Sequence, residues 1–103
     1  MRCEVNFLVP YPSFVATDRR RRAFCSHVAR ILREERESRG LSMTAVAERA
    51  GLSQQMVSYV EREIRIPGLD TLLRITDALG VEVATVIAQA SDAAKANART
   101  KAK

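Results

Sequence analysis

The sequence has few of the residues on which catalytic, metal-binding and disulfide-stabilised proteins depend. It contains no tryptophan, one histidine and two cysteines, Cys3 and Cys25. Two cysteines are too few for a disulfide framework, and these two lack the spacing of a metal site. The one histidine, His27, lies among apolar residues of a predicted helix, and no nucleophile–base pair, phosphate-binding loop or metal cluster can be assembled. We therefore expect a protein that is not an enzyme and that holds no metal and no cofactor.

Long apolar runs are missing as well. No segment of about 18 uncharged apolar residues occurs, so we expect no membrane-spanning helix. The opening stretch contains Glu4 and lacks the apolar centre of a signal peptide. These absences favour a cytoplasmic protein whose two cysteines are ordinary thiols. A chain of 103 residues is long enough for one small domain, and its 47% hydrophobic content can form a core.

Positive charge is concentrated at the two ends of the chain. Residues 1–23 hold five arginines against two acidic residues, and residues 91–103 hold four basic residues against one acidic residue. Residues 24–90 hold eight arginines against nine acidic residues, although the whole chain carries a net charge of +5. Basic ends suit a polyanionic partner such as DNA, because each neutralised phosphate releases counterions. Solvated tails that improve solubility would have the same composition.

Apolar spacing and capping residues predict five helices. The first begins at Asp18 as N-cap, or later near Ala23, because four arginines in a first turn would oppose the helix dipole. It ends at Gly40, where a glycine favours a helix C-terminus. Serine N-caps and further glycines delimit the others, which we expect at about residues 43–50, 54–62, 69–79 and 83–90.

The two ends are predicted separately from the helical domain. Residues 3–9 have the composition of a short strand, although disorder would fit equally. Residues 91–103 are rich in alanine and lysine and contain no large apolar residue, so we expect a frayed or flexible tail. We therefore predict an N-terminal extension at residues 1–22, a helical domain at residues 23–90 and a flexible tail at residues 91–103.

The second and third predicted helices are joined by a glycine turn. Ala47 stands four residues before Gly51, and Ser53 can cap the following helix. Two helices that cross steeply over a tight turn approach closely at one point, where only a small side chain fits. The second helix is then held outward with its N-terminal polar residues in solvent. This geometry can present a helix end to a DNA major groove, but it also occurs in helical bundles that bind nothing.

Four motifs in order resemble the lambda repressor-like family, the Cro/XRE type of helix-turn-helix protein. They are L-R-x-x-R-x-x-x-G-L from Leu32, A-x-x-x-G from Ala47, S-x-x-E from Ser58, and P-x-L-x-T-L-L from Pro67. The similarity spans about residues 24–90. It implies an all-α domain of five helices, usually dimeric on a near-palindromic double-stranded DNA site.

The resemblance also implies roles for individual residues. Base edges would be contacted by Gln54, Gln55 and Tyr59, because glutamine can bind adenine through two hydrogen bonds. Phosphates would be contacted by Ser42, Ser53, Ser58, Arg62 and Arg65, and Arg36 and Glu61 would form a structural ion pair. A basic arm that adds DNA contacts would comprise Arg19, Arg20, Arg21 and Arg22. The alternative is that the glutamines lie on a solvated helix face, and that Ser42 and Ser53 are caps.

Two residues depart from the family pattern. Met43 stands where a glutamine commonly braces the recognition helix and contacts phosphate, and methionine cannot form those hydrogen bonds. Glu63 replaces the glycine that usually follows the recognition helix. A positive φ at Glu63 would cost about 1 kcal/mol, and the carboxylate would add negative charge near the DNA backbone.

These observations predict a sequence-specific, double-stranded DNA-binding transcriptional regulator that acts as a homodimeric repressor. One alternative is an antitoxin or another adaptor that binds a protein partner through its N-terminal strand or C-terminal tail. Another alternative is the controller protein of a restriction–modification system.

Overall fold

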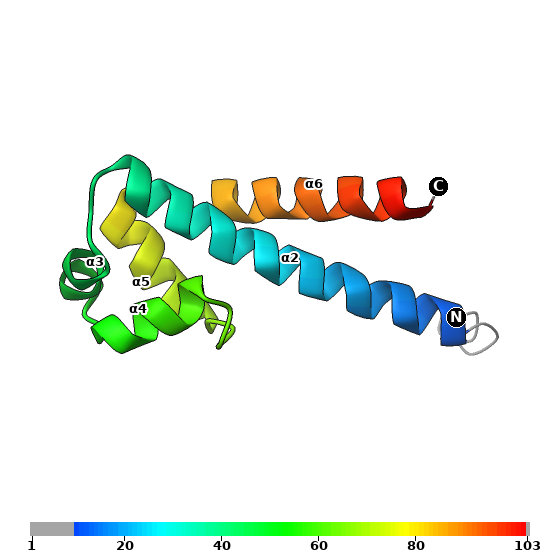
Figure 1. The fold of residues 1–103 in the computed structure, drawn as a ribbon, viewed down its shortest axis with the longest axis horizontal. Coiled ribbons are helices and arrows are strands. Elements are labelled where there is room, and N and C mark those ends of the chain that lie inside the picture. The colour runs from blue at the N-terminus through cyan, green and yellow to red at the C-terminus, as the bar shows by residue number, and fades with distance from the viewer. Residues whose placement is uncertain (1–9, 103) are drawn as a thin grey trace.

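The computed structural model describes the backbone of residues 10–102 and the side chains of residues 18–96. All regular structure in this range is helical (Figure 1). The five helices are α2 (Pro10–Ser38), α3 (Met43–Ala50), α4 (Gln54–Glu61), α5 (Leu69–Leu79) and α6 (Val83–Ala102). The predicted all-α fold with five helices is confirmed. The strand predicted at residues 3–9 lies outside the described residues.

Serine hydroxyls begin two of the central helices. Ser42 accepts a hydrogen bond from the backbone N–H of Ala45 at 3.0 Å, and Ser53 accepts one from Met56 at 3.1 Å. Each bond satisfies a backbone donor that has no partner within the helix. The boundaries of α3 and α4 therefore follow from local sequence.

Four helices end with the same backbone motif. A residue at the C-terminal end of each helix has a positive φ, and the next residue donates its N–H to the carbonyl five positions back. Glycine fills the positive-φ position at the ends of α2, α3 and α5, while α4 uses Glu63, whose φ is 63°. Glu63 therefore has the positive φ that its position suggested, and this conformation lowers the stability of the fold by about 1 kcal/mol.

All five helices contribute to one core. Leu32 of α2, Val46 of α3 and Val57 of α4 are each 1% exposed. α5 adds Leu72, Ile75 and Leu79, and α6 adds Val86 and Ala90. Burial of these side chains is the main favourable contribution to folding.

The first helix begins earlier than predicted. It starts at Pro10, so a start at Asp18 or Ala23 is wrong. Proline is tolerated in a first turn because the N–H it lacks would have no helical partner there. Asp18 lies inside the helix and pairs with Arg21 and Arg22, both at 3.0 Å. The arginine run is therefore far from the helix start, and the expected conflict with the dipole does not arise.

The last helix continues past its predicted end. α6 runs through Ala90 to Ala102, so the prediction of a flexible tail from residue 91 is wrong for the helical residues. Ala90 and Ala94 are 0% and 2% exposed, and α6 lies beside α2 in the opposite direction (Figure 1). Small alanine side chains allow the two helices to approach closely. Both predicted domain boundaries thus fall inside helices.

Candidate DNA-binding surface

The turn between α3 and α4 is tightly packed. Gly51 has φ 71°, and Ala47 and Ala50 are buried. Arg74 of α5 reaches the turn, where its Nη1 donates to the carbonyl of Ala50 at 3.3 Å. A Cβ at position 51 would lie 3.2 Å from that nitrogen. Both the backbone conformation and the close neighbour therefore favour glycine at this position.

One face of α4 is buried, and the N-terminal end of α4 is open. Val57 and Val60 are each 1% exposed, whereas Gln54 and Gln55 are exposed. Ser53 caps the helix at the same end. The two amides therefore project from a helix end that is fixed by packing on the opposite face.

An ion pair connects α2 to the last turn of α4. Arg36 donates from Nε to Glu61 Oε2 at 2.7 Å, from Nη2 to Glu61 Oε1 at 3.1 Å, and from Nη1 to the carbonyl of Leu41 at 2.8 Å. The Glu61 side chain is 4% exposed, and its hydrogen bonds raise the pKa of Arg36. Arg36 therefore stays charged, and its planar group fixes the angle between the two helices.

Met43 contacts Gln54 where the family commonly has a glutamine. Gln54 Nε2 donates to the Met43 sulfur at 3.8 Å, and Met43 packs against the core. A thioether is only a weak acceptor. The contact therefore orients the Gln54 amide weakly and leaves its oxygen and second N–H available.

Gln55, Tyr59 and Arg65 form a connected set along the exposed side of α4. Gln55 Nε2 donates to the Tyr59 hydroxyl at 2.6 Å. The Arg65 guanidinium lies over the Tyr59 ring, 5.7 Å from its centre, which is within cation–π range. Two residues expected to contact bases and one expected to contact phosphate are thus neighbours in the folded chain.

Glu63 is held by a residue of α2. Ser26 donates from its hydroxyl to Glu63 Oε1 at 2.5 Å. The glutamate therefore adopts a backbone conformation that favours glycine while its carboxylate binds α2. This bond is a second connection, besides the Arg36–Glu61 pair, between α2 and the C-terminal end of α4.

The helix-turn-helix family model matches residues 32–86, more than half of the chain. The chain belongs to the helix-turn-helix family. The predicted family is thereby confirmed, and α3 and α4 are its paired helices, with α4 in the recognition position.

Similar proteins carry regulator names. An uncharacterised HTH-type transcriptional regulator from Mycobacterium tuberculosis is 39% identical over 59 residues, which are 57% of this chain and 42% of that protein. Another from Sinorhizobium fredii is 35% identical over 57 residues, which are 55% of this chain and 29% of that protein. The matched region thus spans less than half the length of these curated relatives.

A solved structure shares the fold. The restriction–modification controller protein C.AhdI from Aeromonas hydrophila aligns with a TM-score of 0.57 and 32% identity. The alignment covers 61% of this chain and 94% of that one. The helix-turn-helix domain here is therefore similar to nearly the whole of C.AhdI, and the rest of this chain lies outside the alignment.

The residues expected to contact phosphate occupy different environments. Ser42 and Ser53 are the caps described above, and Ser58 is half-buried in the recognition helix. Arg62 and Arg65 are exposed just beyond that helix. Both caps put helix N-terminal N–H groups at the surface, where such groups favour anions.

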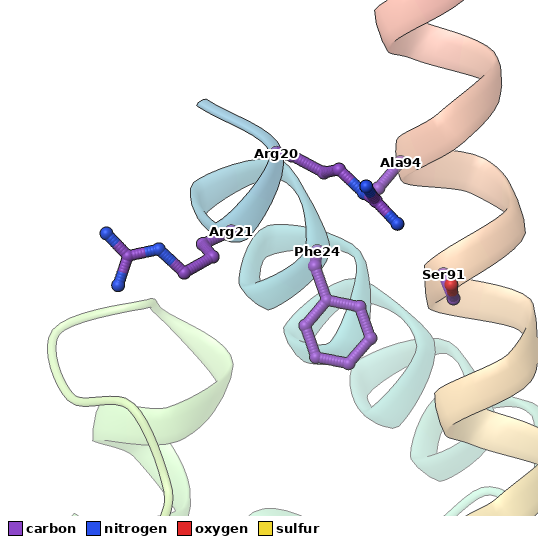
Figure 2. Close-up of a pocket in the computed structure, with 5 residues that line it drawn as sticks. All are labelled: Arg20, Arg21, Phe24, Ser91 and Ala94. Atoms are coloured by element: carbon purple, nitrogen blue, oxygen red, sulfur yellow. The ribbon is translucent and has the colours of Figure 1, made fainter. Parts of the chain in front are cut away.

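The arginine run expected to form an arm belongs to α2 instead. All four arginines are exposed on a continuous helix. In Figure 2, Arg20 extends across to Ala94 of α6, and Arg21 points away from α6. Phe24 and Ser91 complete the lining of this shallow groove. The helix thus directs the guanidinium groups of Arg20 and Arg21 to different sides, and Arg21 and Arg22 both pair with Asp18.

Two residues of this site were not recognised from the sequence. Ser26 is 37 positions from Glu63, and no local pattern connects them. Arg74 could be paired with Asp70 by its four-residue spacing, but its bond to the turn depends on how α5 packs.

Among the described residues, no helix is long and apolar enough to cross a bilayer.

Proposed function

We propose that this protein is a sequence-specific, double-stranded DNA-binding transcriptional regulator that acts as a repressor. The observation that carries the proposal is the exposure of Gln54 and Gln55 at the capped N-terminal end of α4, whose opposite face is buried. A helix held in this way can enter a major groove and present its first side chains to base edges.

The Gln55 amide retains the groups that base recognition requires. Its bond to Tyr59 uses one of two N–H groups, and leaves the second N–H and the oxygen. These can donate to N7 and accept from N6 of adenine at the same time. The Tyr59 hydroxyl accepts from Gln55, so its own proton is free to bind a phosphate or a base. Tyr59 thereby orients Gln55 before DNA is bound.

Phosphate contacts would fix the position of the helix in the groove. The exposed Arg62 and Arg65 follow α4 directly, and the caps Ser42 and Ser53 expose helix N-terminal N–H groups. Such contacts give orientation without sequence information. We further propose a homodimer that reads two half-sites, about 34 Å apart, of a near-palindromic operator.

The proposal is tested by changing both glutamines to alanine and measuring binding to sequences selected from random duplexes. We expect the Gln54→Ala, Gln55→Ala variant to keep its thermal unfolding temperature. Each lost two-bond contact should cost about 1–3 kcal/mol, at least a tenfold loss of specific affinity. The matched control is Gln89→Ala, which removes an exposed amide from α6.

Selection at two salt concentrations separates base reading from phosphate attraction. A binder dominated by phosphate contacts would yield no consensus and a steep salt dependence. Either an absent consensus or an unchanged affinity of the double variant would refute base reading by Gln54 and Gln55.

A second candidate function is control of a restriction–modification system. The similarity to C.AhdI favours it, because 94% of that controller protein aligns with this chain. This candidate requires that the selected sequence occur upstream of genes for a restriction enzyme and its methyltransferase. Finding the sequence only at unrelated promoters would exclude it.

A further inference from the structure

A groove opens between the first and last helices of the structure. It has a volume of about 260 Å³ and is lined by Arg20, Arg21 and Phe24 of α2 and by Ser91 and Ala94 of α6 (Figure 2). We call it the α2–α6 groove. All of its lining residues come from α2 and α6, and none comes from the helix-turn-helix pair α3 and α4. Base reading by α4 therefore does not account for this groove.

The centre of the groove is apolar. Phe24 is partly buried, packs against the core and also lines the groove. Ala94 is 2% exposed and adds a small apolar side chain from the facing helix. Aromatic rings bury a large apolar area and attract another ring beyond the effect of that area. A flat apolar group could therefore lie against the Phe24 ring.

Two polar groups at the groove have no partner within residues 18–96. Neither the Arg20 guanidinium nor the Ser91 hydroxyl forms a hydrogen bond or an ion pair there. Arg21, by contrast, pairs with Asp18 at 3.0 Å and points away from α6. Arg20 extends across to Ala94 (Figure 2), which brings its guanidinium to the groove. A guanidinium can bind a carboxylate through two parallel hydrogen bonds, and the serine hydroxyl can donate a third.

The surrounding charge favours an anion. Residues 18–24 and 91–96 contain four arginines and one lysine against two acidic residues, Asp18 and Asp92. Asp18 is already paired with Arg21 and Arg22. The field around the groove therefore attracts a negative ligand and repels a positive one.

We propose that the α2–α6 groove binds a small aromatic carboxylate. The ring of the ligand lies against Phe24 and Ala94, and its carboxylate accepts hydrogen bonds from Arg20 and Ser91. The groove is slightly smaller than the sites of about 300–1,000 Å³ that hold drug-sized molecules, so the ligand has one or two rings. A ligand of this size in an open groove binds with a dissociation constant on the order of 1 mM. This inference does not depend on DNA binding.

Titration of the full chain with cinnamate, followed by NMR, tests the site. We expect the backbone amide signals of Phe24, Ser91 and Ala94 to shift and to saturate with one dissociation constant. Cinnamamide has the same ring without the charge and should bind about tenfold more weakly, because charged hydrogen bonds are the stronger ones. If cinnamamide binds as tightly as cinnamate, or if cinnamate shifts none of the three signals, the proposal is overturned.

Two further anions test the kind of ligand. Inorganic phosphate has charge but no ring, and it should bind about tenfold more weakly than cinnamate. Phosphate that binds as tightly as cinnamate would make the groove a general polyanion surface, such as one for DNA phosphates, and would overturn the proposal. Octanoate is an acid of similar size without a ring, and tighter binding of octanoate would overturn the choice of an aromatic ligand.

A matched pair of variants separates the groove from the general positive charge. Arg20→Gln should weaken cinnamate binding about tenfold, because it removes the charged hydrogen bonds. Arg19→Gln removes the same charge from a neighbouring exposed residue that does not line the groove, and it should change the affinity less than about twofold. Equal losses in the two variants would mean that charge alone attracts the ligand, contrary to the proposal.

A third variant fills the groove. Ser91→Leu places a larger side chain in the groove from α6, and leucine favours a helix, so the thermal unfolding temperature should not fall. We expect cinnamate no longer to shift the Phe24 signal. A Ser91→Leu protein that binds cinnamate with the natural affinity would place the ligand elsewhere and overturn the site.

Discussion

Replacing Glu63 with glycine should separate two opposing energies at the end of the recognition helix. The backbone of Glu63 has φ 63°, a conformation that costs a residue with a side chain about 1 kcal/mol and costs glycine little. The carboxylate also accepts the Ser26 hydroxyl at 2.5 Å. A hydrogen bond of this kind contributes about 0.5–1.5 kcal/mol net. The relief of strain and the lost bond therefore have similar size and opposite sign.

A double-mutant cycle measures each energy separately. With Ser26→Ala already present, Glu63→Gly only relieves the strain, and we expect the free energy of unfolding to rise by about 1 kcal/mol. With Ser26 in place, the lost hydrogen bond offsets this gain, and we expect a change near zero. The difference between the two backgrounds is the coupling between Ser26 and Glu63.

The assay is urea and thermal denaturation of the four proteins in the cycle. A change of 1 kcal/mol should move the midpoint temperature by about 4–8 °C for a domain of this size. Glu48→Gly is the matched control, because Glu48 lies inside α3 and glycine should lower stability there by about 1 kcal/mol. If Glu63→Gly destabilises the Ser26→Ala protein, the strain argument is wrong. If both backgrounds respond equally, the bond contributes nothing.

Two further predictions concern the connections of α2. Glu61→Ala should lower the free energy of unfolding by about 3–5 kcal/mol in urea denaturation, because it leaves the mostly buried Arg36 guanidinium without its partner. If the free energy of unfolding fell by no more than an exposed ion pair contributes, the Arg36–Glu61 pair would not connect α2 to α4 as described. Ala94→Asp should lower the free energy of unfolding by about 2 kcal/mol or more, because position 94 is 2% exposed. The measurement is the fall in the midpoint temperature of thermal unfolding. Its control, Ala88→Asp on the exposed side of α6, should change stability little, and equal effects of the two would mean that α6 does not pack on α2 at Ala94.

The central part of the fold could be predicted because its signals are local. Ser42 and Ser53 cap helices through bonds to residues three positions later, and Gly51 supplies the left-handed turn between α3 and α4. The exposure of Gln54 and Gln55 follows from their place directly after a cap. These signals depend on a few neighbouring residues, so they can be recognised before the tertiary structure is known.

The ends of α2 and α6 could not be predicted in the same way. Ala90 and Ala94 bury little area each, and their small size matters only because α6 packs against α2, which the sequence of either helix does not show. α2 begins at Pro10, because proline is suited to the first turn of a helix. The Ser26–Glu63 bond joins residues 37 positions apart. Such contacts depend on the packed arrangement, and no short pattern encodes them.

The opposed directions of α2 and α6 determine where other protein could be attached. The start of α2 and the end of α6 lie at the same end of a molecule about 49 Å long, and α3 and the N-terminal end of α4 lie at the other (Figure 1). A domain fused at either end would therefore lie at the end of the molecule opposite Gln54 and Gln55. A sensor or a reporter joined there would leave the exposed N-terminal end of α4 uncovered.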